Sequence, residues 1–199
     1  SKLVELWNCV KVDATTWEVG WGGTLYDAAP GLKTGVFVHP YGVTASGLSM
    51  LAGMITAAEL RDVMLGRAEI EHAIGIGLPV NVQSTSFVAP ATRTDGTITT
   101  GVTTPQGQRF RIPASVNLDA YDFHPITRAV AKAVQRYGFV NWDQGHGLTT
   151  VRCTNPQSGA TGRMPAPVDS IQGATLKQML RNGGGKAPFP WDKVVALAV

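Results

Sequence analysis

Acid–base chemistry is the first possibility that this sequence offers, through His72, Asp95, Asp143 and His146. Cleavage of a glycosidic bond needs an acid and a second carboxylate flanking that bond. Asp27, Asp95 and Asp143 fall in predicted loops or at predicted strand ends, where carboxylates from distant segments can meet. Their spacing does not require them to meet, because aspartate is also a common turn former. His146 follows Asp143 by three residues, so the two side chains could pair across one turn.

His72 belongs to a stretch, residues 70–78, in which larger apolar residues alternate with other residue types. A period of two indicates a strand with one apolar face. It places His72 on the inward face and Glu71 on the opposite face. An imidazole in that position could line a cleft and act as an acid or a base. The alternative is a buried neutral histidine that bonds a backbone carbonyl, which is the commoner state of such a residue.

Glycan binding would use flat aromatic rings, and Trp17, Trp21 and Trp142 are the candidates. Trp17 and Trp21 share one face of a predicted strand. Arg93, in the segment ATRTDG, could bond sugar hydroxyls or a carboxylate. Alternatives remain for each of them, because a tryptophan on a strand often belongs to the core and a loop arginine is often only exposed to solvent.

Motifs that bind a nucleotide or a catalytic metal are missing from the sequence. It contains no P-loop, no GxSxG, no HExxH and no GxGxxG that opens a helix. Cys9 and Cys153 are far apart and fit no zinc spacing. They form either one long-loop disulfide or two free thiols. We therefore expect neither a cofactor nor a metal.

Composition argues against nucleic acid and membrane as partners. The 199 residues carry a net charge of +3, but the 17 basic residues are scattered and form no stripe for phosphates. The longest apolar stretch, residues 42–56, is too short and too interrupted to span a bilayer. Charged residues make up only 16% of the chain, which is low for a soluble domain. The low charge fits a surface that neighbouring subunits cover.

Local signals predict the elements of the first third of the chain. Residues 1–40 read as strands of a hairpin or meander, with a turn at Gly22 and Gly23. Thr56 and Glu59 form a capping box, which predicts a helix over residues 57–65.

One amphipathic helix is predicted over residues 125–137, because its apolar residues are spaced three and four apart. Residues 139–153 read as two strands joined at residues 144–147. We expect one domain over residues 1–199, in which residues 155–199 form a loop, a helix and a C-terminal extension. Helices without βαβ alternation favour a mainly β fold. We expect an antiparallel β-sandwich or jelly-roll-like arrangement with two or three peripheral α-helices.

A succession of segments along the whole chain resembles a family of secreted actinobacterial proteins without an assigned activity. The segments are LVELW, WEVGWGG, TASGLSMLAGMI, the HA of EHAIGI, ATRTDG, PQGQRFRIPA, RAVAKAVQRYGFVNWD and FPWDKVVAL. They are also similar to minor structural, tail-type proteins of phages that infect these bacteria. The resemblance implies that the chain is the C-terminal part of a longer protein, located in a virion, outside the cell or in the cell envelope.

These observations lead to two functional expectations. The first is a non-catalytic virion or secreted envelope component that assembles with other subunits and contacts cell-wall glycan through Trp17, Trp21, Arg93 and Trp142. The alternative is a secreted glycoside hydrolase or polysaccharide lyase that acts on actinobacterial cell-wall polysaccharide.

Overall fold

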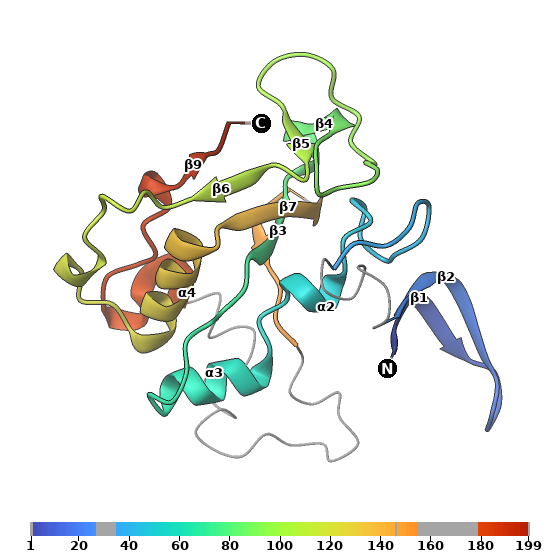
Figure 1. Cartoon of the computed structure of the whole chain (residues 1–199), viewed down its shortest axis with the longest axis horizontal. Helices are drawn as coiled ribbons and strands as arrows, with labels where there is room; N and C mark the ends of the chain where they lie inside the picture. Colours follow the sequence, from blue (N-terminus) through green and yellow to red (C-terminus); the bar gives the residue numbers. More distant parts are fainter. Residues whose placement is uncertain (1, 27–34, 146, 155–178, 199) are drawn as a thin grey trace.

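Strands are the main regular element of this protein. The computed structural model describes residues 2–26, 35–145, 147–154 and 179–198. The strands are β1 (Lys2–Lys11), β2 (Trp17–Tyr26), β3 (Ile74–Leu78), β4 (Gln83–Phe87), β5 (Thr104–Gln106), β6 (Arg109–Arg111), β7 (Phe139–Gln144), β8 (Thr150–Val151) and β9 (Val195–Ala196). The helices are α2 (Met50–Gly53), α3 (Ala57–Met64) and α4 (Pro125–Arg136), with 3-10 turns η1 (Val80–Val82), η2 (Leu118–Ala120), η4 (Gly183–Gly185) and η5 (Trp191–Lys193). Figure 1 shows a main body from which β1 and β2 stand apart.

Five strands form the central sheet, in the order β8-β3-β7-β6-β9. β3 and β7 run parallel, and the other neighbours are antiparallel. The sequence of β3, IGIGL, leaves room for a large side chain: a Cβ on Gly75 would lie 2.2 Å from Cδ2 of Trp142. Trp142 therefore packs directly on the β3 backbone and is only 1% exposed.

α4 supplies much of the core, as its apolar periodicity predicts. Ile126, Val130 and Val134 are buried in one cluster with residues of the sheet such as Phe139. Burying each such side chain contributes roughly 1.5–3 kcal/mol. His124 caps the start of the helix, since its Nδ1 accepts a hydrogen bond from the Ile126 amide at 3.3 Å. The predicted helix is confirmed.

α3 also follows its local signal. The Thr56 hydroxyl accepts from the Glu59 amide at 3.2 Å, and Glu59 Oε2 accepts from the Thr56 amide at 2.8 Å. This reciprocal pair is the predicted capping box. Leu60 and Val63 bury the inner side of the helix against α4.

The hairpin of β1 and β2 is confirmed, but the predicted place of its turn is wrong. The turn spans residues 12–16, where Asp13 Oδ1 accepts from the amides of Thr15 and Thr16, both at 2.8 Å. Gly22 and Gly23 lie inside β2. A Cβ on Gly23 would lie 2.6 Å from the Phe37 ring, so this glycine permits a close contact between the hairpin and the body.

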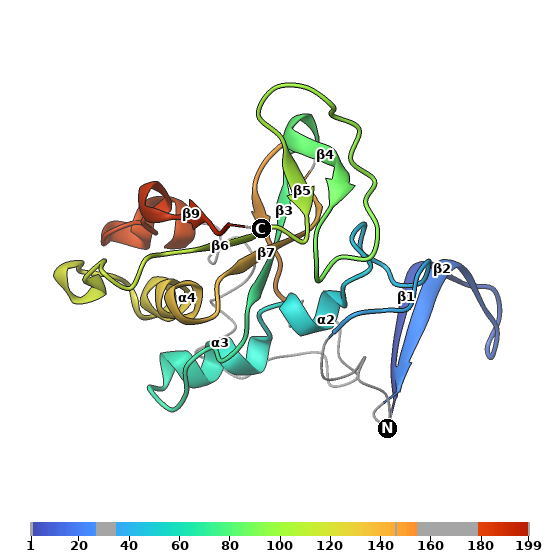
Figure 2. The same cartoon turned by 45° about the horizontal axis from the view of Figure 1, so that its top comes forward.

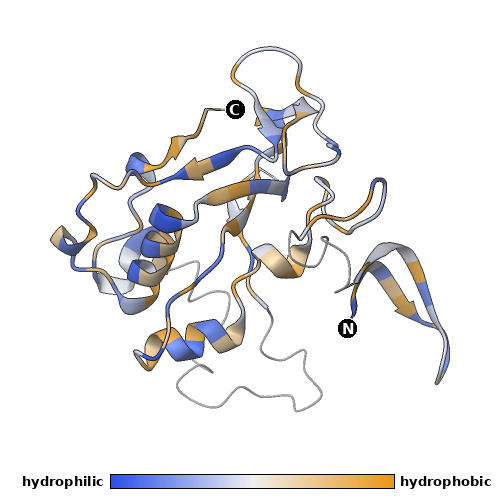
Figure 3. Ribbon diagram, in the orientation of Figure 1, coloured by the Kyte–Doolittle hydropathy of each residue, from blue (hydrophilic) through white to orange (hydrophobic). Residues whose placement is uncertain are grey.

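Most large apolar side chains of this hairpin face solvent. Exposed residues on its strands and turn are Val4, Leu6, Trp7, Val10, Val12, Trp17, Val19, Trp21 and Tyr26. β1 and β2 pair only with each other within the described chain, and Figure 2 shows them extending beyond the body. In Figure 3 orange, hydrophobic stretches appear along this projecting ribbon. The hairpin is thus an apolar arm rather than a part of the core.

The fold is sheet-rich with short helices, but the described strands do not establish a sandwich or a jelly roll. They form three separate, open sheets. The pairing is not uniformly antiparallel, since β3–β7 and β4–β5 are parallel. The two strands predicted over residues 139–153 correspond to β7 and β8, yet β8 pairs with β3 instead of β7.

The structure describes only part of the predicted C-terminal region. Residues 179–182 are helical, in agreement with the end of the predicted helix, and residues 155–178 lie outside the described part. Among the described helices, each is too short or too polar to cross a bilayer.

Candidate functional site

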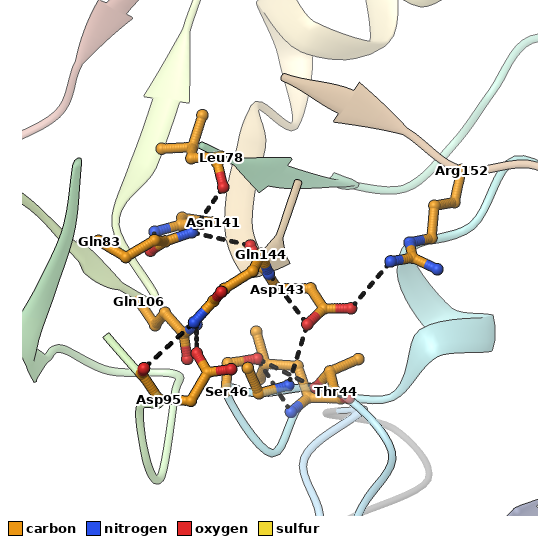
Figure 4. Close-up of polar contacts among 12 residues, drawn as sticks. Thr44, Ser46, Leu78, Gln83, Asp95, Gln106, Asn141, Asp143, Gln144 and Arg152 are labelled. Carbon is orange, nitrogen blue, oxygen red and sulfur yellow. Dashed lines mark hydrogen bonds and ion pairs between the residues drawn. The ribbon is translucent and has the colours of Figure 1, made fainter. Parts of the chain in front are cut away.

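Asp95 and Asp143, two of the predicted acid–base residues, come together beside the end of β7. The side chain of Gln144, the next residue after Asp143, donates to the Asp95 carbonyl at 3.1 Å. The Asp95 carboxylate accepts from Gln106 Nε2 at 2.9 Å. Figure 4 shows the two bonds that hold Asp95, one from Gln144 on the strand that carries Asp143 and one from Gln106 on β5. We call these two residues the aspartate pair.

Asp143 is a partly buried carboxylate with several partners. Its Oδ1 accepts from the Gln144 amide at 3.0 Å and the Ala45 amide at 3.4 Å, and its Oδ2 lies 3.2 Å from Arg152 Nη2. Burial raises the pKa of Asp143, and the charge of Asp95 adds to this rise. The amide hydrogen bonds and the Arg152 charge oppose the rise only in part. Asp143 therefore has the direction of shift that a general acid needs.

A buried pair of amide side chains supports this region. Asn141 Nδ2 donates to Gln83 Oε1 at 2.9 Å and to the Pro105 carbonyl at 3.0 Å. Gln83 Nε2 lies 2.9 Å from the Asp143 carbonyl. Both Gln83 and Asn141 are fully buried. They link β4, β5 and β7, which fixes the backbone on which Asp143 stands (Figure 4).

Arg93, predicted to bind a glycan, instead holds a neighbouring loop. Its guanidinium donates to the carbonyls of Pro40, Gly42 and Thr44. Burial lowers the pKa of Arg93, while the charges of Asp95 and Asp143 raise it in part. Its donors are thus largely committed to the backbone of residues 40–44.

His72 pairs with Glu59, and none of its hydrogen bonds involves the aspartate pair. Its Nε2 is 3.0 Å from Glu59 Oε1, and its Nδ1 is 2.9 Å from the Ala73 carbonyl. The bond to Glu59 raises the pKa of His72, although burial opposes it. When both nitrogens donate, the ring is an imidazolium, so this arrangement does not favour a general base. His72 precedes β3, which starts at Ile74 rather than at the predicted residue 70.

A pocket of about 250 Å³ adjoins His72. It is lined mostly by small and apolar residues, together with Arg109, Ser49 and the edge of Trp142. Neither member of the aspartate pair lines it. Of the candidate acid–base residues that the structure describes, His72 lines this pocket and the aspartate pair does not.

The predicted glycan platforms separate into two kinds. Trp142 is buried beneath α2, against Gly53 and Gly75, and offers no ring to a ligand, which corrects the prediction. Trp17 and Trp21 are exposed on the hairpin. Trp21 lies directly opposite Trp7, and its ring stacks on Tyr41 with centroids 6.1 Å apart. The exposed aromatic surface thus belongs to the arm and not to the aspartate pair.

Some predicted residues lie outside the described part of the chain or have no assigned partner. Asp27 and His146 belong to the first group, so the Asp143–His146 pair stays a prediction. Cys9 is exposed and Cys153 is half-buried, and both are free thiols. Burial raises the pKa of the Cys153 thiol. Within the described residues no three His, Cys, Asp or Glu side chains form a cluster that could hold a metal ion.

Sequence reasoning missed Arg152, Gln83, Asn141 and Glu59 as partners of the candidate residues. Glu59 carried a visible signal, since the capping box placed it at the start of a helix, but its pairing with His72 depends on the tertiary fold. Comparison with protein-family models, with curated proteins and with solved structures finds no significant match for this chain.

Proposed function

We propose that this chain is a non-catalytic component of a virion or secreted envelope assembly and that the β1–β2 hairpin docks it to other subunits. One observation carries the proposal: the hairpin exposes nine large apolar side chains along its strands and turn. Monomeric proteins rarely expose a contiguous apolar patch of this kind, and larger patches mark interaction sites. The location rests on the resemblance of the sequence to secreted actinobacterial and phage tail-type proteins.

The open sheets support the same proposal. Within the described chain the edges of the two-stranded sheets are not closed into a barrel, and an exposed edge is a liability unless it is covered. We propose that neighbouring subunits cover these edges and complete a sandwich or jelly-roll-like arrangement. Where no subunit covers them, Trp17 and Trp21 would provide contact with cell-wall glycan, because their rings are exposed on the same face of the hairpin.

The test measures whether the purified chain associates with anything. Co-sedimentation with actinobacterial cell wall, incorporation into particles of the source, and molar mass in solution are the three readouts. A variant with Trp17→Ser and Trp21→Ser should lose association, whereas Val102→Ser, on an exposed residue outside the hairpin, should keep it. A chain that stays monomeric, binds no cell wall and joins no particle would refute the proposal.

A glycoside hydrolase or lyase is the second candidate, and the meeting of Asp95 with Asp143 favours it. The partly buried Asp143, with its raised pKa, has the character of an acid. Its test is incubation with actinobacterial cell wall while new reducing ends, or unsaturated ends for a lyase, are counted. The enzyme is supported if new ends are released steadily and if the Asp143→Asn variant, still folded, releases none. It is contradicted if no fraction of the wall yields new ends.

A further inference from the structure

The register of the hairpin sorts its side chains onto two faces. Side chains directly opposite each other share a face and alternate along the strand. Glu5 and Leu25 are buried against the body and mark the inner face. The same face continues outward through three opposite pairs, which are Trp7–Trp21, Cys9–Val19 and Lys11–Trp17.

The outer part of this inner face carries three tryptophans. Trp7, Trp17 and Trp21 are 59%, 55% and 42% exposed. Val19, also exposed, lies between Trp17 and Trp21 along β2. We call Trp7, Trp17, Val19 and Trp21 the tryptophan face. Tryptophan is among the residues most often found at the energetic centre of protein interfaces.

We propose that the tryptophan face binds a second copy of this chain, so that two hairpins pack face to face about a twofold axis. This inference rests on the proposed function and names the first partner that the hairpin meets. A twofold contact uses the same patch on both subunits. A two-stranded hairpin with few core contacts is marginally stable alone, and a second hairpin would supply the missing layer.

The exposed area is enough for a stable dimer. An aromatic side chain can bury roughly 150–250 Å², so three half-exposed tryptophans and Val19 offer about 350 Å² of apolar surface. Interfaces are about 60% apolar, so 350 Å² per copy corresponds to about 1,200 Å² of total buried surface. A specific interface needs about 1,000 Å². The tryptophan face therefore exceeds this minimum.

Few charges lie on the tryptophan face. Glu5 is buried and bonded to Ser49, and the exposed charges of the hairpin are Lys2, Lys11, Asp13 and Glu18. Of these, Lys11 shares the tryptophan face, where its Nζ lies 5.8 Å from the centroid of the Trp17 ring. An apolar face with a single lysine is matched by another apolar face rather than by a strongly charged partner.

The experiment uses two matched double variants of the full chain. Trp17→Lys with Val19→Lys changes the tryptophan face, and Val4→Lys with Val10→Lys adds the same charge to the opposite face of the same hairpin. Molar mass by light scattering and tryptophan emission are recorded from about 1 to 100 µM, the affinity range of small interfaces. Circular dichroism of each variant reports whether the body stays folded.

We expect the mass of the native chain to rise with concentration from 21.1 kDa to twice that value. Its tryptophan emission should shift to the blue over the same range, because Trp7, Trp17 and Trp21 leave water. The variant of the tryptophan face should stay monomeric without a blue shift. The variant of the opposite face should behave as the native chain.

Three outcomes would overturn the inference. They are a native chain that is monomeric throughout, a tryptophan-face variant that still dimerises, and loss of the dimer only in the opposite-face variant. A monomer that binds cell wall or joins particles through its tryptophans would refute the second copy and leave the proposed function standing. A monomer that binds neither would refute both.

Discussion

His72 Nε2 lies 3.0 Å from Glu59 Oε1, which ties the segment before β3 to the first turn of α3. Both side chains are about three-quarters buried. Their hydrogen bond raises the pKa of His72 above its usual value of 6.5. In Glu59 burial acts to raise the pKa, but the hydrogen bonds from His72 and Thr56 outweigh it and lower the pKa below 4.5. Each group is therefore stabilised in its charged form by the fold.

The first prediction follows from these opposite shifts. His72 makes its full contribution to the free energy of unfolding at pH values below the pKa that it has in the unfolded chain. This contribution is lost as the pH rises through the higher pKa of His72 in the folded protein. The contribution of Glu59 is present above its unfolded pKa and is lost as pH falls through its folded pKa. The pair should thus contribute most between about pH 5 and pH 6.5. We expect His72→Gln to lower the free energy of unfolding by about 1 kcal/mol at pH 5.5 and by less at pH 9.

Urea unfolding at several pH values measures this difference. In a Glu59→Gln background, which keeps an acceptor for the cap at Thr56, the effect of His72→Gln should lose its pH dependence. An equal effect of His72→Gln at pH 5.5 and pH 9 would contradict the assignment.

The second prediction concerns the contact between Gly75 and Trp142. Because a Cβ at position 75 would lie 2.2 Å from Cδ2 of the buried indole, Gly75→Ala should destabilise the protein by about 3 kcal/mol. Thermal unfolding measures the loss. Trp142→Leu should relieve part of the clash, so the double variant should be more stable than the sum of the two single effects predicts. Additive effects would mean that the indole and β3 do not pack as described.

The elements that could be predicted from the sequence are those whose signals are local. The capping box of Thr56 and Glu59 and the apolar periodicity of α4 lie within a single helix each, and both helices are confirmed. The hairpin turn was misplaced because Gly22 and Gly23 look like a turn, whereas they make room for close packing near Phe37. The true turn depends on Asp13, whose carboxylate bonds the amides that follow.

The candidate site was harder to predict, because it depends on tertiary contacts. Asp95 bonds Gln106 and Gln144, and the second bond brings its loop beside Asp143, which no spacing in the sequence reveals. Trp142 was expected to be a platform for sugars. Gly75 of β3, which allows its burial, was visible in the sequence, but the parallel pairing of β3 with β7 was not.

The third prediction tests the buried amide pair below Asp143. Asn141→Ala would leave Gln83 Oε1 without its donor, whereas the Pro105 carbonyl would keep its hydrogen bond from the Gln108 amide. An unsatisfied buried polar group costs about 1–3 kcal/mol, so we expect a loss of about 3 kcal/mol in the free energy of unfolding. Asn141→Leu keeps about the volume of the side chain but also removes the donor to Gln83 Oε1, so it should cost about as much as Asn141→Ala. A loss well below 1 kcal/mol in both variants, measured by urea unfolding, would show that the hydrogen bonds contribute little.

The fourth prediction concerns Glu5, the residue that fixes the hairpin to the body. Its Oε1 accepts from Ser49 Oγ at 2.6 Å and from the Leu51 amide at 3.0 Å, and its Oε2 accepts from the Met50 amide at 3.1 Å. Glutamine has one acceptor oxygen fewer and turns an amino group toward these donors. Glu5→Gln should therefore loosen the base of the hairpin while α4 and the central sheet keep their structure.

Amide hydrogen exchange distinguishes this local effect from global unfolding. Exchange in β1 and β2 should become at least tenfold faster in Glu5→Gln, which corresponds to a loss of about 1.4 kcal/mol in local stability, and exchange in α4 should be unchanged. Glu18→Gln, on the exposed part of the same hairpin, serves as the control and should leave both rates unaltered. Unchanged exchange in Glu5→Gln would mean that other contacts, such as that of Gly23 with Phe37, hold the hairpin in place. Faster exchange confined to β1 and β2 would identify the buried carboxylate as the anchor that positions the tryptophan face.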